Sequence, residues 1–148
     1  MSRNLLVFLI LLSVMFQSCN TSNSEIKFHK SHEPTRANVP FSDAVETEDF
    51  LFLTGQIGKD HKAGKLVDGG IETETKRVIL NIEDVLKHHN LNLDDVVKCT
   101  VILKDINDFK TFNSVYTQYF TKKPARTTFA AAGLAGGASI EIDVIAAK

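Results

Sequence analysis

Short apolar stretches bounded by polar turns predict that the first half of the folded region is largely β-structure. Residues 39–45 and 49–57 form two such stretches about a polar turn at 46–48, which is typical of two consecutive strands. The second stretch is apolar at successive positions, so we expect it to be covered on both faces or to lie centrally in a sheet. A short strand is predicted at 65–67 and a longer one at 96–103.

Two segments change to a helical period. Apolar residues recur every three or four positions from Ile71 to Leu86, with charged residues opposite, which predicts an amphipathic helix. A second helix is predicted to begin at an Asp108 cap and to bury the aromatic stripe of 109–120. Asn113 falls inside that stripe, where its amide would either bind nearby backbone or face a ligand pocket.

The chain ends in two strand-like arms, 124–130 and 139–148, separated by a glycine-rich segment. This pattern predicts a terminal β-hairpin and completes a single α+β domain. Each arm carries one isolated charge, Arg126 on the first and Glu141 on the second. The arginine suits a bidentate contact with a carboxylate, and the glutamate suits a general base whose pKa is raised by apolar surroundings. The alternative is a structural salt bridge between neighbouring strands.

The N-terminus resembles an export signal. Arg3 precedes the apolar run 5–12, and the segment 1–18 ends in Ser18 before Cys19. A small residue before a cysteine resembles a bacterial lipobox, so we expect Cys19 to be lipidated and the protein to be exported and anchored in the cell envelope. The alternative is an ordinary cleaved signal peptide with an incidental cysteine.

Residues 19–37 are polar and predict a flexible tether that leads into a folded domain at 38–148. Histidines 29 and 32 fall in this tether and are interpreted as solvated, because a metal site needs three or four convergent ligands. His88 and His89 are interpreted as helix-end residues that favour the helix dipole. No metal site is predicted.

Composition narrows the function classes. The 148 residues carry a formal net charge of −1 and no basic run, which argues against nucleic acid as a partner. Cys99 lies within the predicted strand 96–103 and is expected to pack as a small hydrophobic residue.

Several motifs together resemble the RidA (YjgF) family over residues 39–148. They are Phe52-Leu53-Thr54-Gly55-Gln56-Ile57, Gly69-Gly70-Ile71-Glu72, Asn81-Ile82, Lys104-Asp105-Ile106-Asn107-Asp108-Phe109, Pro124-Ala125-Arg126-Thr127 and Ile140-Glu141-Ile142. The resemblance implies a chorismate-mutase-like α+β fold, with a mixed sheet, two helices packed on one face, and a homotrimer with sites between subunits. It also implies a cofactor-independent deaminase that hydrolyses 2-imino acids and enamines to 2-keto acids and ammonia.

The resemblance assigns roles residue by residue. Arg126 matches the family arginine that binds the substrate carboxylate, and Glu141 matches the glutamate that holds and activates water. The expected substrate-binding residues are Phe41, Thr54, Gly55, Asn113 and Thr128. Phe41 stands where the family usually has a pocket tyrosine, so one hydroxyl is missing.

Two competing functions remain open. A non-catalytic binder of small carboxylates in the cell envelope would use the same cleft between subunits. Ribonuclease activity, which is attached to some relatives, is the least compatible with the acidic balance of the chain.

Overall fold

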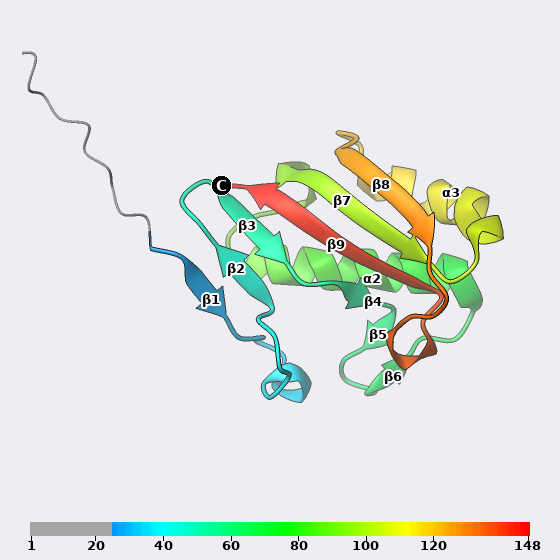
Figure 1. Ribbon diagram of the computed structural model, residues 1–148, viewed down its shortest axis with the longest axis horizontal. Helices are drawn as coiled ribbons and strands as arrows, with labels where there is room; N and C mark the ends of the chain where they lie inside the picture. Colours follow the sequence, from blue (N-terminus) through cyan, green and yellow to red (C-terminus); the bar gives the residue numbers. More distant parts are fainter. Residues whose placement is uncertain (1–24) are drawn as a thin grey trace, which may run out of the picture.

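A mixed β-sheet with two helices packed on one face makes up the part of the chain that the structure describes, residues 25–148 of a computed structural model (Figure 1). The segment predicted to be an export signal, and Cys19, lie outside the described residues. No helix within residues 25–148 is long and apolar enough to cross a membrane. The α+β fold expected from the sequence is confirmed.

The sheet has a strand order that places distant parts of the chain side by side. Its strands, in spatial order, are β1 (Lys27–His29), β2 (Ala44–Glu46), β3 (Phe50–Leu53), β9 (Ile140–Ala147), β7 (Val96–Leu103) and β8 (Ala125–Ala130), and β4 (Gln56–Ile57) also pairs with β9. All pairs are antiparallel except β7 with β8. A separate two-stranded sheet joins β5 (Lys59–Asp60) to β6 (Lys65–Leu66).

The predicted terminal hairpin is wrong. Strands β8 and β9 are not paired with each other, because β7 lies between them (Figure 1). The segment from β7 through helix α3 to β8 forms a β-α-β crossover, which makes β8 parallel to β7. β9 then returns antiparallel to β7 on its other side.

The two predicted helices are confirmed as α2 (Gly70–His88) and α3 (Phe109–Tyr119). Strand β7 occupies the predicted positions 96–103. The predicted cap is wrong: the Asp108 side chain caps nothing, whereas Asp105 accepts a hydrogen bond from the Asn107 backbone in a 3-10 turn (Ile106–Asp108) before α3. Other 3-10 turns lie at Pro34–Arg36, Leu93–Asp95 and Ala135–Gly137.

The core lies between the helices and one face of the sheet. Burial alternates along β9 and along most of β7, so that every second side chain points toward the helices. The larger fully buried residues are Phe112, Leu51, Ile79, Ile82, Leu86, Leu103, Ile140 and Ile142.

The other face of the sheet has no covering layer among the described residues, and we call it the open face. Phe50 and Phe52 of β3 lie on it with 39% and 40% of their surface exposed, as does Phe129 of β8. The second predicted strand was expected to be covered on both faces or to lie centrally in a sheet, and the second alternative holds, because β3 lies between β2 and β9. Exposed aromatic residues on a sheet face are typical of an interaction surface.

The predicted tether is wrong from Lys27 onward. Strand β1 pairs with β2, and the following turn carries Arg36, which forms an ion pair with Asp43 (3.0 Å) and donates a hydrogen bond to Gln56 (2.6 Å). Because Asp43 and Gln56 are both buried, this pairing ties the N-terminal segment to the domain.

Candidate active site in two halves

The first half of the candidate site is a cavity of about 500 Å³ beside Glu141. The predicted residues Phe41, Thr54 and Gly55 line the same cavity. Phe41 is half exposed, and Thr54 is fixed by a hydrogen bond from its backbone N–H to the Asp43 carbonyl (3.0 Å). The structure therefore brings together four of the seven predicted site residues.

Gly55 has no side chain because the Glu141 carboxylate occupies the space. A Cβ at position 55 would lie 2.9 Å from the Glu141 Cδ and closer still to its Oε1. The close approach fixes where the carboxylate can sit. Burial, and secondarily the negative charge of Asp143, raises the pKa of Glu141 above its ordinary value, which is the change a general base near neutral pH needs.

A buried carboxylate on helix α2 positions the start of β9, and thus Glu141. Glu74 accepts hydrogen bonds from the backbone N–H of Ser139 (2.8 Å) and from its hydroxyl (2.6 Å). Asn81 of the same helix donates to the carbonyls of Ile57 (3.1 Å) and Lys59 (2.9 Å), which holds the wall of the cavity against α2. Neither Glu74 nor Asn81 was predicted to shape the site, although polar residues on the apolar side of an amphipathic helix were the available signal.

Three cationic or titratable side chains that the sequence analysis did not select also line the Glu141 cavity. They are Arg36, Lys59 and His61. The Nδ1 atom of His61 is buried without a hydrogen-bond partner, and burial lowers the pKa of this imidazole. The His61 imidazole is therefore a polar group that a ligand in this cavity could contact.

The second half of the site surrounds Arg126. Its guanidinium lies over the rings of Tyr116 (4.6 Å), Phe112 (5.1 Å) and Phe109 (5.7 Å), and it forms no ion pair within residues 25–148. Aromatic faces hold a guanidinium by cation–π attraction and leave its N–H groups free for a carboxylate. A cavity of about 420 Å³ adjoins it and is also lined by Asn113.

Two polar atoms near Arg126 lack partners among the described residues. The Oδ1 atom of Asn113 and the Oγ1 atom of Thr128 are both buried without a hydrogen bond. Buried polar atoms are rarely left unsatisfied, so a ligand or another chain is the expected partner. Of the two roles considered for Asn113, this favours the ligand pocket.

Cys99 contacts Tyr116, one of the aromatic residues under Arg126. It is fully buried and lies 3.3 Å from the hydroxyl of Tyr116, as expected for a cysteine that packs as a small hydrophobic residue. Burial raises the pKa of the Cys99 thiol to about 11, so it stays protonated and is not a nucleophile.

One chain does not bring Arg126 and Glu141 together. Arg126 lies opposite Cys99 on the helix-covered side of the sheet, whereas Glu141 lies opposite Ile102 on the open face. Strand β7 separates them, so the two side chains form no salt bridge within one chain.

Comparison with known proteins places this arrangement in a family. Residues 31–148 match the family described as Endoribonuclease L-PSP, and the chain belongs to this family, also known as the RidA/YjgF family. A bovine 2-iminobutanoate/2-iminopropanoate deaminase is 43% identical over 110 residues, covering 74% of this chain and 80% of the relative.

Solved structures agree with the fold. The crystal structure of the yeast protein YEO7 is similar with a TM-score of 0.78 and 40% identity, covering 84% of this chain and 99% of that chain. The structure of Escherichia coli TdcF with bound serine has a TM-score of 0.75 and 26% identity, covering 82% and 98% respectively. The RidA-type fold expected from the motifs is confirmed.

Proposed function

We propose that this protein is a cofactor-independent deaminase that hydrolyses 2-imino acids, and the enamines that tautomerise to them, to 2-keto acids and ammonia. The observation that carries the proposal is a partly buried Glu141 with a raised pKa, held against Gly55 at the edge of a cavity of about 500 Å³. Relatives at 43% identity that are named as 2-iminobutanoate/2-iminopropanoate deaminases support the same chemistry.

The working unit in this proposal is a homotrimer. Its clefts combine Arg126, Asn113 and Thr128 of one subunit with Glu141 and Gly55 of the next. Two observations support it: the two halves occupy opposite faces of the sheet, and the open face carries exposed aromatic residues that a second copy would cover.

In the proposed mechanism, Arg126 binds the substrate carboxylate through two hydrogen bonds and fixes the imine carbon near a water molecule. Glu141 accepts a proton from that water as its oxygen bonds to the imine carbon. The proton passes to the nitrogen and gives a carbinolamine. Glu141 then takes the proton of the carbinolamine hydroxyl and passes it to the amine, so that the carbon–nitrogen bond breaks, ammonia leaves and the keto group forms. Thr128 and the backbone near Gly55 stabilise the leaving amine. The imine is already electrophilic, so the proposal invokes no cofactor.

The test is release of ammonia and 2-keto acid from 2-iminobutyrate that an amino-acid-oxidising enzyme generates in the assay. We expect the wild-type protein to accelerate hydrolysis well above the rate of the Arg126→Ala variant. Equal rates for the two proteins would reject the enzyme. Thermal stabilisation by 2-keto acids without turnover would instead support a carboxylate binder in the same cleft.

The proposed ligand class agrees with one solved relative. TdcF has been crystallised with serine, an amino acid whose carboxylate and α-nitrogen have the layout of a 2-imino acid. The small net charge of −1 and the absence of a basic run give no support to an RNA substrate.

We also propose that the protein is exported and anchored through Cys19. The support is the apolar run 5–12 and the small residue Ser18 before the cysteine. Expression in a bacterial host with an alkyne-tagged fatty acid should label the wild-type protein and not Cys19→Ser. Equal labelling, or none in either protein, would reject lipidation.

A further inference from the structure

Four of the five histidines of the chain gather where the N-terminal segment meets the end of helix α2. The His29 and His89 rings lie 4.6 Å apart between centroids, His32 stacks on His88 at 4.7 Å, and His88 and His89 are 5.5 Å apart. The sequence alone had placed two of these histidines in a solvated tether and two at a helix end. Their convergence comes from the fold.

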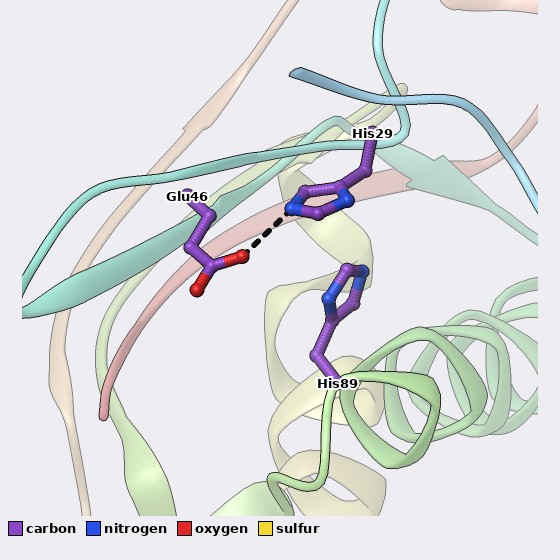
Figure 2. Close-up of side chains that lie close together, drawn as sticks. All are labelled: His29, Glu46 and His89. Carbon is purple, nitrogen blue, oxygen red and sulfur yellow. Dashed lines mark hydrogen bonds and ion pairs between the residues drawn. The ribbon is translucent and has the colours of Figure 1, made fainter. Parts of the chain in front are cut away.

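One part of this cluster has the donor set of a metal site. A nitrogen of His29, a nitrogen of His89 and a carboxylate oxygen of Glu46 all lie within 4.8 Å of one another, and none of the three residues is exposed. Figure 2 shows the two rings and the carboxylate converging, with His29 Nε2 at 2.8 Å from Glu46 Oε2. Two imidazoles and one carboxylate are the protein ligands of many zinc sites that keep one position open.

Three different elements supply the ligands. His29 on β1 and Glu46 on β2 are diagonal neighbours of an antiparallel pair, with Lys27 opposite Glu46, so both side chains lie on the same face. His89 is the C-terminal cap residue of α2. The C-terminal end of a helix carries partial negative charge, which favours a cation at this position.

The rest of the surroundings also suits an ion. Lys148 binds Glu46 through the other carboxylate oxygen, Oε1, at 2.6 Å, and it also donates to the Thr47 carbonyl. This orients Glu46 and leaves Oε2 for a metal, as hydrogen bonds to ligating carboxylates do in known sites. A cavity of about 180 Å³ lined by Glu46, His89 and Lys148 leaves room for a water molecule as fourth ligand.

Only small movements of the three side chains are needed to bind a metal ion. Ligand atoms about 2.0 to 2.2 Å from a tetrahedral ion lie roughly 3.3 Å from one another. The His29–Glu46 pair must open slightly from 2.8 Å, and the widest pair, within 4.8 Å, must close. Side-chain rotation covers both changes.

We propose that His29, Glu46 and His89 bind one divalent transition-metal ion, with zinc as the best fit, completed by a water molecule. The ion takes the place of the hydrogen bond between His29 Nε2 and Glu46 Oε2, and the His29 imidazole keeps its N–H on Nδ1. Bound metal would fasten β1 to the end of α2 and thereby hold the N-terminal segment on the domain. The site is independent of the proposed deaminase reaction.

A second group, His32 with Glu33 and Asp84, carries no such proposal. It is more open, since the Asp84 side chain is 59% exposed, and its His32 Nε2 is already bound to Asp84 at 2.8 Å. His32 of this group, and His88, on which His32 stacks, supply the matched controls.

The test is calorimetric titration of the full chain with Zn²⁺, after chelator treatment and without a polyhistidine tag. We expect one ion per chain and a higher melting temperature with zinc. His29→Gln and His89→Gln should each weaken binding at least about tenfold. His32→Gln and His88→Gln should leave it unchanged.

Glu46→Gln, which is close to isosteric, guards against a variant that merely misfolds. It should keep the circular dichroism spectrum of the wild type and lose the visible absorption of a bound Co²⁺ probe. The proposal is overturned by the absence of saturable binding, by binding that survives His29→Gln and His89→Gln, or by binding lost in the His32 and His88 controls instead.

Discussion

Arg126 and Glu141 project from opposite faces of the same sheet, with strand β7 between them. Arg126 lies against the aromatic rings of α3 on the helix-covered face. Glu141 lies against Gly55 on the open face. Neither group forms an ion pair within residues 25–148. In the proposed homotrimer, the two groups would belong to complementary halves of a cleft that a second copy completes.

This arrangement predicts complementation between inactive variants. Arg126→Ala and Glu141→Gln should each lose most imine hydrolysis as separate proteins, by about two to three orders of magnitude. Mixed trimers formed by unfolding and refolding the two variants together should regain activity, because some clefts then combine an intact Arg126 with an intact Glu141. The measurement is ammonia release by the mixture and by each variant alone.

Activity that does not return would mean that the arginine and the glutamate act within one chain or in separate sites. A control in which each variant is refolded alone and then mixed should stay inactive. This separates subunit exchange from a simple gain on refolding.

Gly55→Ala should displace the Glu141 carboxylate. A Cβ at position 55 overlaps the Glu141 side chain, so we expect a fall of about a hundredfold in kcat with a smaller change in stability. Gly133→Ala is the matched control, since a Cβ there has no atom within 4 Å. Equal activity of Gly55→Ala and Gly133→Ala would show that the position of the carboxylate does not matter for the reaction.

The pH profile should carry the signature of Glu141. The general base works only when ionised, and its pKa is raised above the ordinary 4.5 by burial and by Asp143. The rate should therefore fall on acidification at a pH above 4.5. Asp143→Asn removes the neighbouring negative charge and should move this acidic limb to lower pH, whereas Asp68→Asn, at a fully exposed position, should not move it.

Phe41→Tyr should improve the reaction. Phe41 lines the Glu141 cavity with its ring half exposed, so an added hydroxyl could bind the substrate or the water without displacing core residues. We expect kcat/KM to rise by about tenfold, the value of one hydrogen bond to a charged group. Phe28→Tyr on β1 is the control, and a gain of the same size there would remove the argument for position 41.

Ser139→Ala should destabilise the folded chain. It leaves the buried Glu74 carboxylate with only the backbone N–H of residue 139, at a cost of about 1 to 3 kcal/mol in the free energy of unfolding. Ser114→Ala removes an exposed hydroxyl bond on α3 and should cost much less. Urea denaturation of the two variants gives the comparison.

The parts of the fold that the sequence predicts are those with a local cause. The 3.6-residue period places α2 and α3, and the high content of β-branched and apolar residues places β7 at 96–103. The pairing of β8 and β9 is not local: both arms read correctly as strands, yet β7 separates them. The sequence of neither arm indicates which strand it pairs with.

The candidate site divides in the same way. Residue motifs single out Arg126 and Glu141, but only the register of three strands shows that they lie on opposite faces. The contact between His29 and His89 could not be predicted either. Sixty residues separate them, and β1 falls in a segment with little apolar content. Its hold on the domain comes from polar contacts such as the Arg36–Asp43 ion pair.

In the proposed homotrimer, the aromatic residues on the open face would make activity depend on protein concentration. A lone chain exposes Phe50, Phe52 and Phe129, so dilution below the dissociation constant of the trimer would abolish the proposed activity while every chain stays folded. Specific activity would then depend on how much protein is present. In a cell, the concentration of the protein would then control its activity, without any effector.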